Sequence, residues 1–215
     1  MQSVALIDYG SGNLRSAEKA LQKAAAGLAS PPEIVTTDDP ELIARADRIV
    51  LPGVGAFAAC MAHLAERPGV IEAMTQAVRR RGAPFLGVCV GMQLLATRGL
   101  EFGETQGLDW IAGDVRWMGP AYGSFKIPHM GWNALELVAA HPLFRGLPDG
   151  THMYFTHSYA FWPTDPYYEM AVTNHGGGVF PAAVAQDNVA GVQFHPEKSQ
   201  AAGGRLLANF LEWRP

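Results

Sequence analysis

A cysteine between two glycines is the clearest chemical feature of this 215-residue sequence. Cys89 follows the apolar run 84–88, and Gly87 and Gly91 stand two residues to either side of it. Because glycines lack Cβ atoms, the chain can turn sharply from a strand into a helix there. The pattern predicts a nucleophile elbow with sulfur in place of oxygen, at a helix N-terminus that favours thiolate. The alternative is a small buried hydrophobe, which is our interpretation of Cys60.

A histidine and a glutamate two residues apart have the types needed to activate such a thiol. His195, Pro196 and Glu197 follow a strand-like run that starts at residue 189. Pro196 disfavours helical dihedrals at His195, so residues 195 and 197 are expected to point to the same side. Glu197 would hold one imidazole nitrogen while the other faces Cys89. Alone, this motif is equally consistent with a capped turn, and it is the cysteine elbow that favours catalysis.

A second glycine-rich turn follows the strand-like run 48–51. Gly53, Val54 and Gly55 can expose backbone N–H groups to an anion without obstruction by side chains. Acyl transfer to sulfur passes through a tetrahedral oxyanion that fixed donors must stabilise. The turn is a candidate oxyanion hole, although Pro-Gly-x-Gly is also a common structural turn.

Alternating strand and helix patterns would bring these turns together. Strand-like runs are found at residues 3–8, 33–36, 48–51, 84–88 and 189–194. Helical patterns are found at residues 13–26, 39–44, 57–81, 91–97 and 199–213. This order predicts an α/β fold with an open, mostly parallel sheet and helices on both faces, whose sites lie beyond the strands' carboxyl ends. Residues 107–191 are rich in turns and aromatics, which predicts antiparallel strands within a single domain, 1–215.

The composition excludes several classes of protein. With 48% hydrophobic and 17% charged residues, the chain is not disordered. Its net charge is −4 and its only basic cluster is 79–81, so no nucleic-acid partner is expected. No apolar run approaches a membrane span, and the N-terminus lacks the basic region of a signal peptide. Two cysteines and scattered histidines predict a cytoplasmic protein without disulfides, metal or other cofactor.

The chain resembles the class I (triad) glutamine amidotransferases and, more narrowly, the glutaminase subunits of imidazole glycerol phosphate synthases. The matching segments are 7–14 (IDYGSGNL), 51–57 (LPGVGAF), 87–93 (GVCVGMQ), 127–133 (IPHMGWN), 156–159 (THSY) and 191–200 (GVQFHPEKSQ). The triad motifs specify only the class, whereas 128–133 and 195–200 carry the narrower likeness. The resemblance implies a flavodoxin-like, three-layer fold with a mixed sheet.

The resemblance also implies a reaction. Cys89 would attack the side-chain amide of L-glutamine, His195 would act as acid and base, and Glu197 would orient the imidazole. The implied oxyanion donors are Gly53, Val54, Gly55 and Val90. The implied substrate-binding residues are Gln93, Ser158 and Tyr159 for the α-carboxylate end, and Glu101 for the α-ammonium group, with Glu104 as the alternative.

The implied partner is the cyclase subunit of a heterodimeric imidazole glycerol phosphate synthase, in histidine biosynthesis. Ammonia would pass to it directly, because free ammonia in neutral water is mostly non-nucleophilic ammonium. The candidate interface residues are His129, Met130, Trp132 and Lys198, since Met and Trp suit such surfaces. Trp132 is alternatively an ordinary core aromatic.

Three segments depart from the family pattern, and other functions remain open. Val90 stands where leucine is expected, the loop 98–105 is less acidic than expected, and 173–178 is glycine-rich where a tyrosine is expected. The alternatives are another triad glutaminase, an inactive scaffolding subunit, and a stand-alone γ-glutamyl hydrolase or cysteine peptidase.

Overall fold

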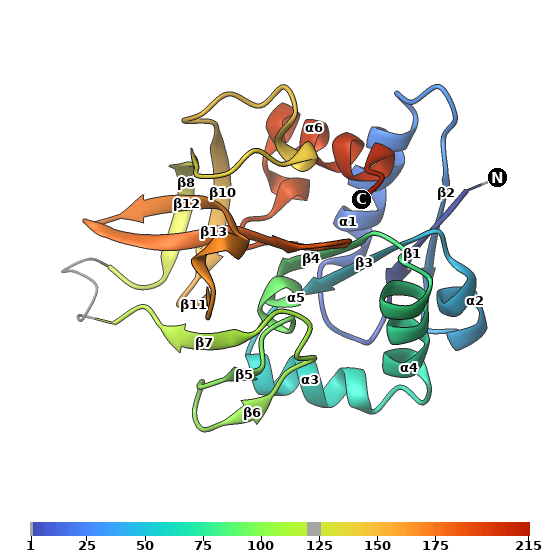
Figure 1. Ribbon diagram of the computed structural model, residues 1–215, viewed down its shortest axis with the longest axis horizontal. Helices are drawn as coiled ribbons and strands as arrows, with labels where there is room; N and C mark the ends of the chain where they lie inside the picture. Colours follow the sequence, from blue (N-terminus) through green and yellow to red (C-terminus); the bar gives the residue numbers. More distant parts are fainter. Residues whose placement is uncertain (1, 120–125) are drawn as a thin grey trace.

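A twisted mixed sheet runs through the middle of the molecule (Figure 1). The computed structural model describes residues 2–119 and 126–215. The parallel strands are, in spatial order, β2 (Glu33–Thr37), β1 (Ser3–Ile7), β3 (Arg48–Gly53), β4 (Phe85–Cys89) and β14 (Val189–Val192). The antiparallel strands β13 (Gly178–Gln186), β12 (Glu169–His175) and β9 (Glu136–Leu137) extend the sheet. Strands β3, β4 and β14 are buried along their whole length, which accounts for their continuous apolar runs.

Helices cover both faces of the sheet, as the alternating pattern predicts. On one face α1 (Leu14–Ala25) packs against α6 (Gln200–Glu212) (Figure 1). The other face carries α2 (Pro40–Arg45), α3 (Phe57–Ala65), α4 (Val70–Thr75) and a π-helical turn, η1 (Gln76–Arg80). Helix α2 begins where the sequence predicts, because the Asp39 carboxylate accepts the N–H of Glu41 at 2.8 Å.

The helix after the cysteine is shorter than predicted. Helix α5 spans only Val90–Gln93, whereas the sequence pattern predicts a helix over 91–97. The segment 107–111 folds back and donates its N–H groups to the carbonyls of Leu94, Leu95, Ala96 and Thr97. These carbonyls therefore bind a neighbouring segment rather than a further helical turn. The dipole at Cys89 is accordingly that of about one turn of helix.

Two small sheets, together with the antiparallel strands of the large sheet, contain the strands of residues 107–191, and their antiparallel pairing confirms the prediction. Strand β8 (His129–Ala134) pairs with β10 (His152–His157). Strand β7 (Gly113–Trp117) pairs with β11 (Tyr159–Pro163) and with β5 (Arg98–Gly99), which pairs with β6 (Thr105–Gln106). Short 3₁₀ turns are η3 (Pro142–Phe144), η4 (Pro166–Tyr168) and η5 (Pro196–Lys198).

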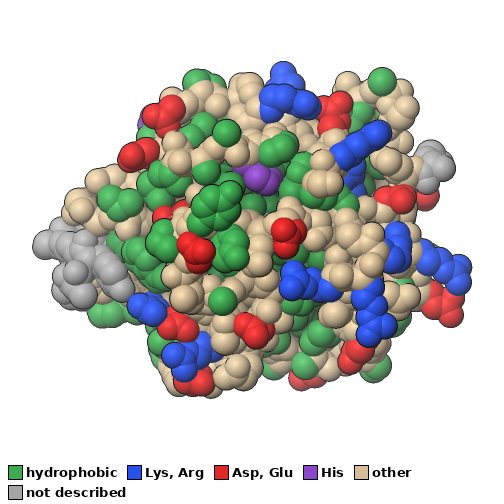
Figure 2. All heavy atoms as spheres, in the orientation of Figure 1, with side chains coloured by type: hydrophobic (Ala, Val, Ile, Leu, Met, Phe, Trp, Pro, Cys, Tyr) green, Lys and Arg blue, Asp and Glu red, His purple; other side chains and the backbone are tan. Residues whose placement is uncertain are grey.

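Charged and hydrophobic side chains are unevenly spread over the face in Figure 2. Lys and Arg gather over the α2 and α4 end, with acidic side chains among them, whereas hydrophobic side chains gather toward β12 and β13. Across residues 2–119 and 126–215, no helix has both the length and the hydropathy needed to traverse a bilayer.

Candidate active site

The cysteine sits on a strained turn at the carboxyl end of β4. Its φ is +55°, a region that non-glycine residues rarely adopt. A Cβ at Gly91 would overlap the carbonyl oxygen of Leu51, and a Cβ at Gly87 would overlap the carbonyl of Gly91. Both glycines are therefore required by close backbone approach, and the predicted elbow is present in the structure.

His195 and Glu197 lie together beyond the end of β14. The Nδ1 of His195 is 2.8 Å from Oε1 of Glu197, and their side chains are only 3% and 7% exposed. Because an ionised carboxylate only accepts, Nδ1 carries the proton in this contact. The other nitrogen, Nε2, is buried without a hydrogen-bond partner in the part of the chain that the structure describes. His195 and Cys89 line the same cavity, of about 350 Å³.

Electrostatics favour the charged form of this imidazole. Burial by itself lowers the pKa of His195, but the nearby Cys89 sulfur and the Glu197 carboxylate that is hydrogen-bonded to Nδ1 both favour the charged imidazole and outweigh burial. The pKa of His195 is raised from 6.5 to about 9. A positive imidazolium beside the sulfur favours thiolate, the nucleophilic form of cysteine.

Replacing Glu197 with glutamine should flatten the pH dependence of stability. The raised pKa of His195 contributes stability that is fully present below about pH 6.5 and is lost as the pH rises through about 9. Cys89 and Glu197 both raise this pKa, and the Glu197→Gln variant lacks the Glu197 charge, so its urea midpoint should fall less between these pH values. Glu104→Gln, which changes an exposed carboxylate elsewhere, is the control. Parallel profiles for the wild type and Glu197→Gln would contradict the assignment.

The candidate oxyanion segment lies beside the elbow. Gly53 pairs with Cys89 across β3 and β4, and a Cβ on Gly53 would come within 2.7 Å of the Gly91 nitrogen. Val54, Gly55 and Val90 line the cavity, while Gly53 is not among its lining residues. The turn thus brings backbone close to the sulfur, as expected from the sequence.

Three side chains that the sequence analysis did not connect with this segment hold its carbonyl groups. The Tyr9 hydroxyl donates to the Pro52 carbonyl at 2.7 Å. The Val54 carbonyl accepts from the Ser11 hydroxyl at 2.9 Å and from the Cys60 thiol at 3.3 Å. Cys60 is buried, as our interpretation of it requires. Its hydrogen bond leaves no signal in the sequence spacing, because it depends on how α3 packs.

The predicted substrate residues all line the cavity. Gln93, Glu101, Ser158 and Tyr159 form its walls together with His157. Burial, and then the negative charge of Glu101, raise the pKa of the Tyr159 phenol, so these two side chains lie near each other. A carboxylate and backbone groups on one cavity wall suit the α-ammonium and α-carboxylate groups of an amino acid.

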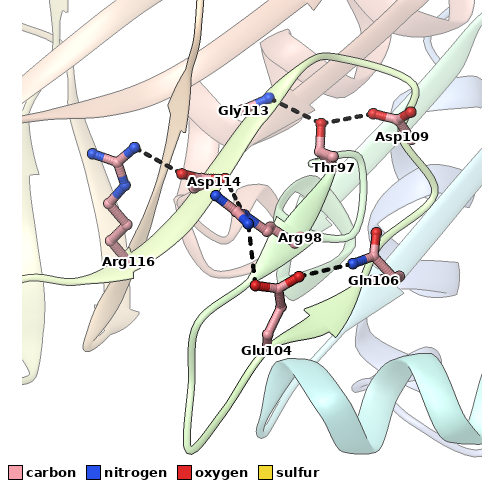
Figure 3. Close-up of polar contacts among 8 residues, drawn as sticks. All are labelled: Thr97, Arg98, Glu104, Gln106, Asp109, Gly113, Asp114 and Arg116. Carbon is pink, nitrogen blue, oxygen red and sulfur yellow. Dashed lines mark hydrogen bonds and ion pairs between the residues drawn. The ribbon is translucent and has the colours of Figure 1, made fainter.

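The structure distinguishes Glu101 from its alternative, Glu104. The Glu101 carboxylate lines the cavity and accepts the N–H of Phe57 at 2.7 Å. Glu104 instead binds Arg98 at 3.1 Å and the Gln106 amide, outside the cavity lining (Figure 3). Figure 3 shows this network continuing from Arg98 to Asp114 and Arg116.

Two glutamine side chains connect the cavity wall to the sulfur. The Gln93 amide nitrogen donates to the Tyr159 carbonyl and to Gln193 Oε1, each at 3.0 Å. Gln193 in turn lies with its amide nitrogen 3.7 Å from Cys89 Sγ. Gln93 thus supports the wall through its donor groups. Gln193 was missed by the sequence analysis, although its place two residues before His195 is a usable signal.

Four side chains form a surface that we call the β8–β10 face: Met130, Trp132, Tyr154 and Lys198. Met130 is 63% exposed and Trp132 is 47% exposed. The Trp132 ring meets the Tyr154 ring edge-on at 6.0 Å, and Lys198 Nζ lies 5.6 Å from the Tyr154 centroid. Thr156, which lies opposite Met130 in the strand register, lines the cavity. This apolar face therefore adjoins the candidate active site.

His129 does not belong to this face, which corrects its assignment to the interface. Its side chain is 2% exposed and stacks on Phe155 and His175. Side chains alternate along a strand, so Met130 and Trp132 point outward while His129 points inward. Among the residues described, no group of three or more His, Cys, Asp or Glu is arranged to hold a metal ion.

Comparisons with known proteins find similar sequences along nearly the whole chain. A family model described as "Glutamine amidotransferase class-I" matches residues 5–213. The chain is 63% identical over 215 residues to "Imidazole glycerol phosphate synthase subunit HisH" of Caulobacter vibrioides, covering 100% of both chains. It is 54% identical to the protein of that name from Ruegeria pomeroyi, covering 98% of this chain and 99% of the relative.

Solved structures show the same fold at low sequence identity. A structure described as a glutamine amidotransferase superposes with a TM-score of 0.70 at 21% identity, covering 97% of both chains. A glutamine amidotransferase from Thermotoga maritima gives a TM-score of 0.61 at 17% identity, covering 98% of this chain and 96% of the other. On the family match and the full-length relatives, the chain belongs to the class-I glutamine amidotransferase family.

Proposed function

We propose that this chain is the glutaminase subunit of an imidazole glycerol phosphate synthase, acting as one amidotransferase domain in the cytoplasm. It hydrolyses L-glutamine to L-glutamate and supplies the ammonia to a cyclase subunit in histidine biosynthesis. The observation that carries the proposal is the meeting of Cys89 with the paired His195 and Glu197 at one cavity. The full-length relatives at 54–63% identity support the choice of pathway.

The proposed reaction passes through a thioester. The thiolate of Cys89 attacks the side-chain carbonyl carbon of glutamine, and the oxyanion faces backbone N–H groups of the 53–55 turn and Val90. The imidazolium of His195 gives its proton to the departing nitrogen, which leaves as ammonia. His195 then takes a proton from water, the hydroxide attacks the thioester carbon, and glutamate leaves the sulfur. Glu197 holds the imidazole through Nδ1 during both steps.

Glutaminase turnover with and without the cyclase tests the proposal. We expect the 53–55 turn to serve as the oxyanion hole only after a peptide rearrangement, so turnover should be low alone and should rise with the cyclase and its nucleotide substrate. A stand-alone hydrolase or peptidase would be equally active without the partner. Another triad glutaminase would not respond to this cyclase, and an inactive scaffold would show no turnover in any mixture.

The β8–β10 face is the proposed docking surface for the cyclase. Truncating a half-buried tryptophan at the centre of an interface typically costs about 2 kcal/mol, or roughly 30-fold in affinity. We expect Trp132→Ala to weaken cyclase binding to about that extent, measured by titration calorimetry. Tyr167→Ala removes an aromatic side chain that is 82% exposed and lies outside this face. Equal effects of the two truncations would argue against this docking surface.

A further inference from the structure

A buried pair of histidines, of which His157 lines the cavity and His129 lies behind it, is not used by the proposed reaction. His157 Nε2 and His129 Nδ1 are 2.9 Å apart, and His157 Nδ1 is 2.8 Å from the Tyr159 carbonyl oxygen. At the other end, the Asn133 amide nitrogen is 3.1 Å from His129 Nε2 and donates to the Asn174 carbonyl at 2.8 Å. The pair thus links strand β8 to the backbone of Tyr159, which lines the cavity next to Ser158.

The two ends of this chain fix the proton positions within it. A carbonyl oxygen only accepts, so His157 must carry its proton on Nδ1, which leaves Nε2 as an acceptor. His129 must then donate from Nδ1, and its Nε2 accepts from the Asn133 amide. Every ring nitrogen is satisfied only when both imidazoles are neutral and protonated on Nδ1. Protonation of either ring would place two donors against each other.

Burial keeps both rings in that neutral form. His129 is 2% exposed and His157 is 7% exposed. Burial, and then the neighbouring histidines, lower the pKa of His129 to about 3. Burial is the main cause that lowers the pKa of His157 to about 4, with the Tyr159 carbonyl opposing it. Phe155 and His175 stack on the ring of His129 at 4.5 and 4.2 Å, which fixes its orientation.

The Tyr159 carbonyl is the point at which two hydrogen-bond chains meet. His157 donates to this carbonyl from β10, and the Gln93 side chain donates to it from α5 at 3.0 Å. Through Gln193 the second chain continues to Cys89 Sγ. The backbone at Ser158 and Tyr159 is therefore held from both sides of the cavity. Losing the His157 donor would leave the Tyr159 carbonyl bound by the Gln93 side chain alone, without changing the sulfur, the catalytic imidazole or the carboxylate.

We infer that His129 and His157 are positioning residues for glutamine binding: as two neutral imidazoles in series, they lock the Tyr159 carbonyl and so set the cavity wall that receives the α-carboxylate end of glutamine. This inference rests on the proposed function. His157 acts by donating a hydrogen bond to the Tyr159 carbonyl. His129 acts by donating to His157 Nε2, which keeps the proton of His157 on Nδ1.

Steady-state glutaminase kinetics of His157 variants, in complex with the cyclase and its nucleotide ligand, test this inference. His157→Phe keeps a ring but removes the donor, so the KM for glutamine should rise about tenfold while kcat changes little. His157→Asn places an amide N–H near the former Nδ1 and should restore most of the lost affinity. A role in folding alone would not separate KM from kcat and would not distinguish phenylalanine from asparagine.

His141→Phe is the matched control. His141 is also a partly buried histidine whose pKa burial lowers, to about 4, but it packs on Trp213 away from the cavity. An unchanged KM in a folded His157→Phe, or an equal rise in His141→Phe, would overturn the inference. A wild-type complex without glutaminase activity would instead overturn the proposed function.

The tautomers can be read in the wild-type protein, whatever the variants do. Long-range ¹H–¹⁵N spectra of the wild-type complex should show both rings neutral at pH 7 and protonated on Nδ1. A proton on Nε2 of His157 would contradict the hydrogen-bond order and overturn the inference.

Discussion

Replacing Cys89 with alanine should abolish synthesis from glutamine while leaving synthesis from added ammonium salts intact. The variant has no sulfur to form the thioester, so glutamine-dependent turnover should fall by about 10⁴-fold or more. The cyclase chemistry belongs to the partner in the proposed function, and added ammonia reaches it without the glutaminase. Both rates are measured on the same reconstituted complex.

Cys60→Ala provides the matched control for this result. Cys60 is the second buried free thiol, and it lies behind the 53–55 turn rather than in the cavity lining. The Cys60→Ala variant keeps Cys89 and should therefore still form the thioester with glutamine. Loss of both glutamine- and ammonia-dependent synthesis in Cys89→Ala would contradict the division of labour between the two subunits.

A methyl group at position 91 should have the second largest effect. The Cβ of Gly91→Ala would overlap the backbone carbonyl of Leu51 in the adjacent strand, and backbone cannot move aside as a side chain can. Overpacking of this kind costs about 3 kcal/mol or more and displaces the elbow. We expect a lower free energy of unfolding in urea, and a loss of glutaminase activity in the protein that still folds.

Gly204→Ala is the control for the added methyl group. Gly204 lies in α6, and a Cβ there meets nothing within 4 Å. Alanine is favoured over glycine within helices by up to about 1 kcal/mol, so this variant should be as stable as the wild type or more so. Wild-type stability and activity in Gly91→Ala would show that the elbow does not depend on close backbone approach.

Local patterns in the sequence were sufficient to predict the layered fold and the elbow. Apolar runs closed by glycine mark β3 and β4, and the glycines around Cys89 are where backbone meets backbone. The spacing of His195 and Glu197 correctly placed their side chains together. These features depend on residues near one another in the chain, which is why they can be read without coordinates.

Features that depend on packing between distant segments were not predictable. The position of His129 on the inner side of β8 depends on the phase of the strand, which the register with β10 sets. The early end of α5 depends on a segment more than ten residues away. Tyr9, Ser11 and Cys60 converge on one turn only because the chain after β1 and helix α3 meet at the residues that follow β3.

Covalent labelling by a chloroketone analogue of L-glutamine tests the central claim most directly, since it reports which thiol the site activates. Peptide mass spectrometry of the complex with the cyclase is expected to find the label on Cys89 alone, with protection by glutamine. His195→Gln should label more slowly, because the imidazolium no longer favours thiolate. Labelling of Cys60 in preference to Cys89, or no labelling of the folded complex, would contradict the account.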